Sequence, residues 1–272
     1  MLGCEFRMVR PGSTVGIMAR YTHGHHETVL RSHRWRTAEN SCAYLLPALR
    51  TEDSVLDVGC GPGTITVDLA ERVARVVGLE ATPEAVELAT TAGVDCVLGD
   101  VHALPFDDNS FDVVHAHQVL QHVTDPVQAL REMARVSRRL VAVRDSDYLG
   151  FTWFPECRGL TRWMELYQAA AVANGGHPQA GRELLSWALE AGLTDVTPSS
   201  STWCFATPDD RAWWGGMWAE RIQQSALARQ LLREGLATQE DLDLCTEGWH
   251  TFVTRDNGWL SVLHGELLVR VG

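Results

Sequence analysis

Short apolar runs and longer amphipathic segments alternate along the first half of the chain. Each apolar run predicts a buried β-strand, and each amphipathic segment predicts a helix with one packed face. The predicted strands are 54–58, 73–79, 95–98, 111–115 and 140–143, and the predicted helices are 31–49, 64–72, 83–91 and 125–136. Strands and helices in this alternation imply an α/β fold, in which a parallel sheet has helices on both faces.

The pattern changes after residue 147, where tryptophans accumulate and helical segments outnumber strands. A helix at 182–191 and a strand at 195–205 predict that the sheet resumes, and 263–271 is the candidate last strand. Two further helical segments, 208–234 and 238–254, are too long to be simple turns. We interpret them as a helical lid or an insertion that forms part of a substrate pocket.

A glycine-rich turn follows the first predicted strand, in the segment VLDVGCGPGT at 55–64. Glycines at positions 59, 61 and 63 remove the Cβ atoms that would keep a ligand away, and they allow the positive φ angles of a tight turn. The nicotinamide-binding fingerprint G-x-G-x-x-G would place its third glycine at position 64, where this chain has Thr64. The spacing therefore favours a different nucleoside ligand, although any tight strand-to-helix turn can need one or two glycines.

Two acidic residues stand at the ends of the next two predicted strands. Glu80 comes about 20 residues after the first glycine, a spacing at which a carboxylate accepts hydrogen bonds from both hydroxyls of a ribose. Asp100 is placed where a carboxylate can accept a hydrogen bond from the exocyclic amine of adenine. Taken alone, Glu80 is equally well explained as a solvated residue at a helix N-terminus. Signals at three successive strand ends nevertheless point to one ligand at the carboxyl edge of the sheet.

Composition narrows the class of partner and the compartment. The 272 residues carry a formal net charge of -12, which repels a phosphate backbone and disfavours a nucleic-acid substrate. The seven cysteines contain no CxxC pair, so we interpret them as reduced thiols and not as a disulfide framework or a zinc site. No apolar run approaches the roughly 18 residues of a membrane span, and we expect a cytoplasmic protein without a membrane partner.

The segments VLDVGCGPG, GLE and GDVHALPFDDNSFDVVHAHQVLQHV together resemble the class I S-adenosylmethionine-dependent methyltransferases, and within them the ubiquinone/menaquinone-biosynthesis and small-molecule methyltransferases. The resemblance covers residues 20–147. It implies a Rossmann-like fold with a mostly parallel, seven-stranded sheet, S-adenosyl-L-methionine as methyl donor and S-adenosyl-L-homocysteine as product. The residues that it assigns to the donor site are Tyr21, Arg36, Asp57, Gly59, Gly61, Gly63, Glu80, Asp100, Val101 and His117.

The resemblance gives each of these residues a part of the donor. Glu80 would hold the ribose diol, and Asp100 would meet the adenine N6 atom, with the Val101 backbone at N1. Asp57 and the three glycines would surround the methionine and ribose portions.

The methionine moiety would have further neighbours. His117 would lie beside it, and Tyr21 and Arg36 from the N-terminal segment would close over it.

The resemblance also divides the chain into three parts that we expect to form one compact unit. These are an N-terminal helical segment at 1–50 that covers the donor site, a donor-binding core at 51–150, and the rest of the sheet with a helical substrate lid at 151–272. The sequence departs from the family pattern in two places: RVSRRLVAVRD replaces a Pro-Gly-Gly turn, and the helix after Glu80 is shortened. The first departure affects the bounds of the fifth strand and the placement of Asp145.

Two clusters of histidines raise the hypothesis of a metal site, at His23, His25 and His26 and at His115, His117 and His122. On a strand, His115 and His117 would point to the same face, and imidazole is a common ligand for zinc and iron. No carboxylate or thiolate stands at matching spacing, however. A packed His115 and a donor-contacting His117 explain the same residues, and we predict no metal.

The candidate catalytic residues are His122 and Asp145. The resemblance implies that His122 faces the acceptor and that Asp145 is the matching acid after the fifth strand. A histidine beside a carboxylate is a usable general base near neutral pH, because the acid fixes the tautomer and stabilises the imidazolium. The alternative for His122 is a helix-capping or core histidine.

The tryptophans beyond residue 150 admit three interpretations: core, an aromatic acceptor pocket, or a protein-interaction surface. Trp213, Trp214 and Trp218 cannot all face one core stripe, so at least one should line a pocket or an interface. An aromatic pocket suits a planar or apolar small molecule.

These observations predict methyl transfer to an oxygen, nitrogen or carbon nucleophile of a small metabolite, by a monomer or a homodimer. The alternatives are a donor-binding regulatory subunit without turnover and a nicotinamide-dependent oxidoreductase, which Thr64 disfavours.

Overall fold

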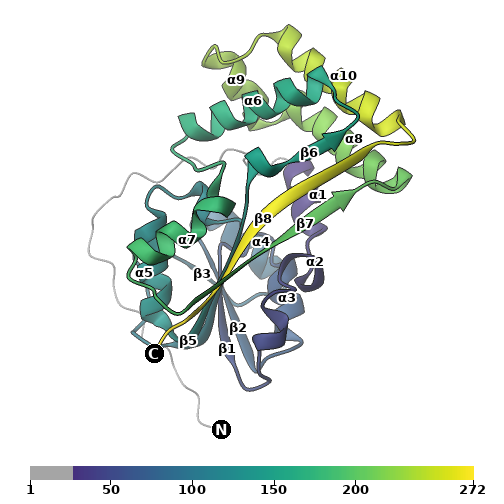
Figure 1. Ribbon diagram of the computed structural model, residues 1–272. Helices are drawn as coiled ribbons and strands as arrows, with labels where there is room; N and C mark the ends of the chain where they lie inside the picture. The colour runs from purple at the N-terminus through teal and green to yellow at the C-terminus, as the bar shows by residue number, and fades with distance from the viewer. Residues whose placement is uncertain (1–26) are drawn as a thin grey trace.

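The computed structural model describes residues 27–272 and shows a twisted sheet beneath a layer of helices (Figure 1). Five strands are parallel: β1 (Ser54–Val58), β2 (Arg75–Glu80), β3 (Cys96–Leu98), β4 (Phe111–His117) and β5 (Ser137–Ser146). The last strand, β8 (Trp259–Arg270), pairs antiparallel with β5, β6 (Thr152–Phe154) and β7 (Val196–Phe205). Within the described residues the sheet has the order β3-β2-β1-β4-β5-β8-β6, with β7 also paired to β8.

The sheet has eight strands, which corrects the prediction of seven. The additional strand is β6, whose three residues pair with the first three of β8. Its brevity explains why the sequence pattern did not predict it, since three residues are too few to show a period of two. The mostly parallel α/β architecture itself is confirmed.

Connecting helices cover the sheet, and local capping signals set where two of them, α4 and α5, begin. They are α3 (Thr64–Ala70), α4 (Pro83–Thr91), α5 (Pro126–Val136) and α7 (Ala180–Glu190). The Thr82 side chain accepts a hydrogen bond from a backbone N–H of the first turn of α4, and Asp125 does the same for α5. Each cap is followed by proline at the first helical position, where the missing N–H is harmless.

The prediction of one helix over 31–49 is wrong. The chain instead forms α1 (Glu27–Arg34), α2 (Ala38–Ser41) and the 3-10 turn η1 (Leu46–Ala48). Thr37 and Asn40 make a reciprocal capping box that starts a new helix, and Pro47 lies inside the 3-10 turn. Trp35 and Arg36 therefore lie between the two helices and not within one continuous helix.

Four helices form the upper layer in Figure 1, and they are α6 (Arg158–Ala173), α8 (Pro208–Gln224), α9 (Ala226–Arg233) and α10 (Gln239–Thr254). The helix expected over 208–234 is interrupted at Ser225, whose backbone is extended. Trp163, Trp218 and Trp249 fill the centre of the layer, with ring centroids of Trp163 at 4.7 Å from Trp218 and 4.8 Å from Trp249. The core interpretation is therefore confirmed for these tryptophans.

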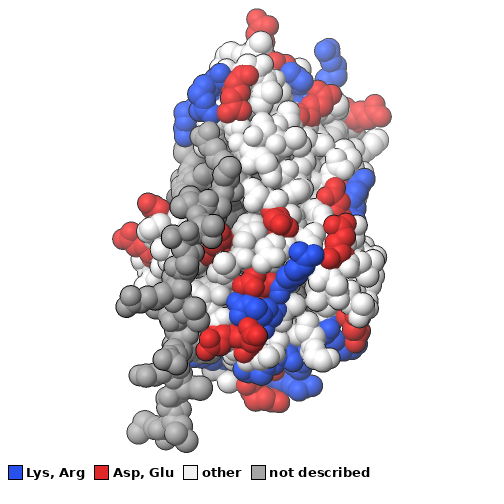
Figure 2. Space-filling view, turned by 90° about the vertical axis from the view of Figure 1, so that its left-hand side faces the viewer, with Lys and Arg blue, Asp and Glu red and all other residues white. Residues whose placement is uncertain are grey.

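Parallel pairing brings the carboxyl ends of β1 to β4 to one edge of the sheet, next to the helical layer. Val58 pairs with Leu79 on one side and Ala116 on the other, so the turn after β1 lies between Glu80 and His117. On the face shown in Figure 2, basic and acidic side chains are interspersed. Within residues 27–272 no helix combines the length and the apolar character needed to cross a bilayer.

Candidate active site

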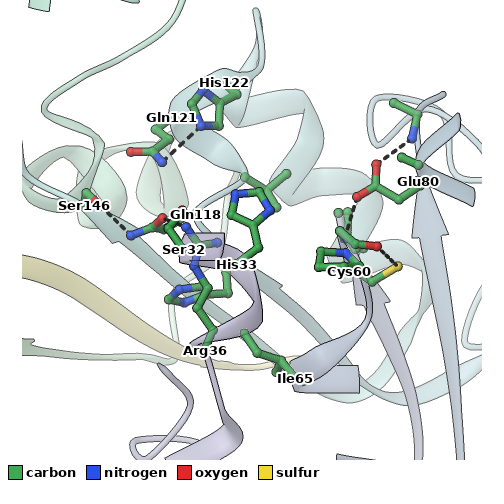
Figure 3. A pocket seen from close by; sticks show the side chains of 18 of the residues that line it. Ser32, His33, Arg36, Cys60, Ile65, Glu80, Gln118, Gln121, His122 and Ser146 are labelled. Carbon is green, nitrogen blue, oxygen red and sulfur yellow. Dashed lines mark hydrogen bonds between the residues drawn. The ribbon is translucent and has the colours of Figure 1, made fainter. Parts of the chain in front are cut away.

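A cavity of about 370 Å³ lies at the carboxyl edge of the sheet (Figure 3). We call one side of it the carboxylate end, which is lined by Asp57, Gly59, Gly61, Glu80 and Asp100. We call the other side the aromatic end, which is lined by Tyr148, Phe151, Trp203, Trp214, Trp218 and Arg221. The strand order separates the two, because β2 and β3 lie on one side of β1 whereas β5, β7 and β8 lie on the other.

The turn after β1 uses its three glycines in two ways. Their φ angles are +65°, +57° and +85° at Gly59, Gly61 and Gly63, in the left-handed region that favours glycine. A Cβ atom on Gly59 or Gly63 would lie 2.5 Å from a valine methyl group, so packing within the protein excludes a side chain there. A Cβ atom on Gly61 would meet only His33, at 3.5 Å, across the cavity wall. Gly61 therefore leaves its backbone open to a ligand.

Glu80 and Asp100 line the carboxylate end as the sequence predicted. Glu80 Oε1 accepts a hydrogen bond from the Gly61 backbone N–H at 2.6 Å, and its Oε2 accepts one from the Ala81 N–H at 3.1 Å. Asp100 Oδ1 lies 2.9 Å from the His102 backbone N–H and 2.7 Å from its ring Nδ1. Carboxylate oxygens are acceptors of the type that ribose hydroxyls and the adenine amine require.

The structure brings most of the predicted donor-site residues into this cavity. Arg36, Asp57, Gly59, Gly61, Glu80, Asp100, Val101 and His117 all line it. Gly63 starts α3 behind the wall, and Tyr21 lies outside the described residues.

Asp57 anchors a buried chain of polar groups beneath the cavity. Its carboxylate accepts hydrogen bonds from Thr66 Oγ1 at 2.6 Å and from His115 Nδ1 at 2.8 Å, and His115 Nε2 lies 3.2 Å from Cys42 Sγ. Burial alone would lower the pKa of His115, but the neighbouring Cys42 and Asp57 raise it to about 10. Both ring nitrogens of His115 are thus committed to protein partners.

The second histidine cluster is spread over different environments. Within residues 27–272 no three His, Cys, Asp or Glu side chains are grouped so that they could hold a metal ion. His23, His25 and His26 lie outside the described residues.

Gln118 organises the centre of the cavity, and sequence reasoning missed it. Its backbone has φ of +55°, a conformation that non-glycine residues rarely adopt. Its Oε1 accepts from the Arg36 guanidinium at 2.6 Å, and its Nε2 lies 2.7 Å from Ser146 Oγ and 2.9 Å from His264 Nε2. Strained residues of this kind cluster at functional sites. The one feature of the sequence that could have indicated Gln118 as a cavity residue is its position directly after His117.

His117 lines the cavity beside Gln118 and is 5% exposed. Neither of its ring nitrogens has a hydrogen-bond partner in the part of the chain that the structure describes. Burial and the nearby positive charges of Arg144 and Arg36 hold its pKa well below the usual value for histidine. The ring is therefore neutral at pH 7 and offers one donor and one acceptor to a ligand.

His122 also lines the cavity, at the 3-10 turn η2 (Leu120–His122). Burial and the positive charge of Arg36 lower its pKa to about 3, so the ring is neutral. Its Nε2 lies 3.2 Å from the side-chain nitrogen of Gln121, as Figure 3 shows.

Asp145 lies behind the cavity wall and is fully buried. Its carboxylate accepts hydrogen bonds from the backbone N–H groups of Leu120 and Gln121, at 3.3 and 3.2 Å. Asp145 therefore meets the turn that carries His122 through the backbone. Burial raises the pKa of Asp145 to about 7, although these two N–H groups favour its charged form.

The three tryptophans of α8 do not share one role, in agreement with the prediction that at least one lines a pocket or an interface. Trp214 and Trp218 line the cavity, whereas Trp213 packs against Trp35 with ring centroids 5.2 Å apart. Trp203 from β7 lines the same end and donates its indole N–H to the Asn40 carbonyl at 2.6 Å. The N-terminal segment is thereby tied to the wall of the cavity.

Comparison with known proteins places this cavity in a family context. A methyltransferase domain model matches residues 56–140, which include the glycine turn, Glu80 and Asp100. A methyltransferase of Schizosaccharomyces pombe is 32% identical over 270 residues, covering 92% of this chain and 96% of the relative. The demethylmenaquinone methyltransferase of Mycolicibacterium gilvum is 30% identical over 204 residues, covering 74% of each chain.

The fold is shared with a solved structure of phosphoethanolamine N-methyltransferase 2 from Haemonchus contortus, in complex with phosphomonomethylethanolamine and S-adenosylhomocysteine. The TM-score is 0.51 at 16% identity, over 82% of this chain and 50% of that chain. The sequence relatives indicate the same family as the arrangement of the sheet, the glycine turn and the acids at the strand ends. This chain belongs to the class I S-adenosylmethionine-dependent methyltransferases.

Proposed function

We propose that this chain transfers a methyl group from S-adenosylmethionine, bound at the carboxylate end, to a small-molecule acceptor bound at the aromatic end. The observation that carries the proposal is the continuity of one cavity from Glu80 and Asp100 to Trp203 and Trp218. Donor and acceptor bound in one enclosed space meet the requirement for in-line transfer, which depends on alignment. The names of the relatives above support the same reaction.

The carboxylate end fits the donor. Gly61 leaves a backbone surface that a Cβ atom would fill, and Glu80 faces the cavity from the end of β2. Glu80 would accept hydrogen bonds from the ribose, Asp100 from the adenine amine, and Arg36 would close over the methionine portion. When bound, S-adenosylmethionine supplies a methyl group on a positively charged sulfur and is released as S-adenosylhomocysteine.

The chain's own contribution is to position the acceptor, exclude water and remove a proton. The bound donor would supply the methyl group and keep the electron pair of the broken carbon–sulfur bond, and the neutral ring of His122 would accept the acceptor's proton. Because burial and Arg36 lower the pKa of His122 to about 3, the ring is unprotonated at pH 7 but is a weak base, which would take the proton only once methylation has made it strongly acidic. Asp145 acts as a positioning residue through the backbone of the turn.

The test is acceptor-dependent release of S-adenosylhomocysteine from methyl-labelled S-adenosylmethionine, with phenolic, quinone-like and sugar-bearing metabolites. We expect label to appear in one acceptor class with the wild type and to fall sharply with Glu80→Ala at limiting donor. Donor binding without turnover on every acceptor class would instead favour a regulatory subunit. Binding of NAD in place of S-adenosylhomocysteine would contradict the proposal.

A further inference from the structure

One stripe of helix α8 faces the aromatic end of the cavity. Trp214, Trp218 and Arg221 follow one another by four and three positions, which places them on the same side of a helix. All three line the cavity. The stripe thus presents two indole rings and one guanidinium to the same enclosed space.

Other elements supply aromatic surface to the same end. Tyr148 and Phe151, at the 3-10 turn η3 (Tyr148–Gly150) and just after it, stack with ring centroids 4.5 Å apart and an interplanar angle of 19°. Trp203 adds a third surface from β7. Aromatic rings from three separate elements around one cavity favour a planar ligand that packs against ring faces and edges.

One of the buried indoles at this end carries an unpaired polar atom. Trp214 is 6% exposed, and its Nε1 has no hydrogen-bond partner within residues 27–272. Buried N–H donors are normally paired, because an unpaired donor loses the hydrogen bond that water would give it. An oxygen atom on a bound ligand would satisfy this donor.

The charges around the cavity are segregated. Among the described residues that line it, the carboxylates Asp57, Glu80 and Asp100 all belong to the carboxylate end. Arg221, at the aromatic end, is 3% exposed and has its Cζ 4.6 Å from the ring centroid of Trp218. Arg36, where the two ends meet, is positive as well.

Of the four histidines that line the cavity, His117 and His122 add no positive charge. Burial lowers the pKa of His117 well below its usual value and that of His122 to about 3, so both rings are neutral at pH 7. A guanidinium in a space of low dielectric attracts an anion far more strongly than it would in water. The chain's net charge of -12 repels anions at long range, so the preference is a local property of this end of the cavity.

We propose that the methyl acceptor is an aromatic anion, whose ring packs among Trp203, Trp214 and Trp218 and whose carboxylate faces Arg221. The inference rests on the proposed function, because it assigns the aromatic end to the acceptor. A carboxylate suits a guanidinium because the two can form paired, charge-assisted hydrogen bonds.

Three probes of one skeleton test the proposal by calorimetric titration into protein saturated with S-adenosylhomocysteine. They are 4-hydroxybenzoate, its neutral analogue 4-hydroxybenzamide, and the non-aromatic acid trans-4-hydroxycyclohexanecarboxylate. We expect 4-hydroxybenzoate to bind at least tenfold more tightly than either of the others. Equal binding of the amide would overturn the charge assignment, and equal binding of the cyclohexane acid would overturn the aromatic one. If none of the three binds while S-adenosylhomocysteine does, the proposal is wrong.

Substitutions at Arg221 locate the preference. Arg221→Gln should abolish the advantage of the benzoate over the benzamide, and Arg221→Lys should retain part of it. Val172→Ala, on the exposed outer side of α6, is a matched control that should leave the preference intact. Affinity for S-adenosylhomocysteine is measured for each protein, so a failure of the donor site, which would refute the proposed function, is distinguished from a failure of the acceptor assignment. A benzoate preference that survives Arg221→Gln with donor affinity unchanged would contradict the role of Arg221.

Discussion

The carboxylate of Glu80 is hydrogen-bonded to the backbone N–H of Gly61, with 2.6 Å between Oε1 and the nitrogen. One contact therefore joins the end of β2 to the glycine turn after β1, the two elements that would bind opposite sides of a nucleoside. The same carboxylate lines the cavity. Glu80 thus shapes the turn and borders the cavity.

Replacement of Glu80 should weaken the donor site without unfolding the protein. We expect Glu80→Ala to reduce S-adenosylhomocysteine affinity by about 1.5 to 3 kcal/mol, because charge-assisted hydrogen bonds to the ribose are lost. Glu80→Gln should lose less, since its amide oxygen can still accept from Gly61. Titration calorimetry and thermal unfolding measure the two effects. Unchanged affinity with a collapsed melting temperature would show that Glu80 is purely structural.

The three glycines of the turn should respond differently to alanine. Gly63→Ala should destabilise the fold strongly, because its Cβ atom would lie 2.5 Å from a side-chain atom of Val94 and its φ is +85°. Gly61→Ala has the same kind of backbone strain, at φ of +57°, but its Cβ atom would meet only His33, at an ordinary contact distance of 3.5 Å. We expect Gly61→Ala to fold with a modestly lower melting temperature and to lose more than tenfold in donor affinity. Equal donor affinity in Gly61→Ala and wild type would place the donor elsewhere.

Two substitutions at Gln118 separate the effect of its strained backbone from the effect of its side chain. Gln118→Gly relieves the strained φ of +55°, a change of the order of 1 kcal/mol, whereas Gln118→Ala retains it. Both variants remove the hydrogen bond to Arg36. We therefore expect both to lose methyl transfer by a similar factor, with Gln118→Gly the more stable protein in urea unfolding. Wild-type rates in the two variants would show that Gln118 does not position the guanidinium.

His122 and Asp145 should affect the chemical step and leave donor binding nearly intact. Removal of a general base typically costs about 10² to 10⁴ in rate, and we expect at least a tenfold loss in single-turnover rate for His122→Ala. Asp145→Asn should lose less, because it acts through the backbone. Since the pKa of His122 is about 3, its titration should not reduce the rate of wild type between pH 8 and pH 5. Wild-type rates in both variants would mean that alignment alone drives the transfer.

Asp145 also gives stability a definite dependence on pH. Burial raises its pKa from 3.8 to about 7, so the folded protein holds a proton here that the unfolded chain releases. The stabilisation of the folded protein by the protonated Asp145 carboxyl is complete below about pH 4 and is lost as the pH rises through 7. Asp145→Asn cannot ionise, so the free energy of unfolding of wild type should fall relative to the variant from pH 5 to pH 8. Parallel curves from urea unfolding would contradict the buried, protonated carboxyl.

Local sequence patterns predicted the elements that bear the carboxylate end. The apolar run before the glycine turn acts over a few residues and can be recognised without tertiary contacts. The single helix expected over 31–49 failed because a repeat of apolar positions does not reveal the capping box at Thr37.

The aromatic end depends on contacts between distant segments. Trp203 meets Asn40 across 163 positions of sequence, and Gln118 meets His264 across 146. Helical spacing predicted that the tryptophans of α8 could not all face one core stripe and that at least one would line a pocket or an interface, but it gave no reason to include Arg221. The strained backbone of Gln118 is a property of the folded turn, and its residue type carries no sign of it.

Titration of the wild-type protein with S-adenosylhomocysteine and, separately, with NAD tests the central claim most directly. The arrangement of Gly61, Glu80 and Asp100 predicts one molecule of S-adenosylhomocysteine bound per chain, binding that is more than tenfold weaker in Gly61→Ala, and no binding of NAD. Saturable binding of NAD by a protein that does not bind S-adenosylhomocysteine would contradict the account.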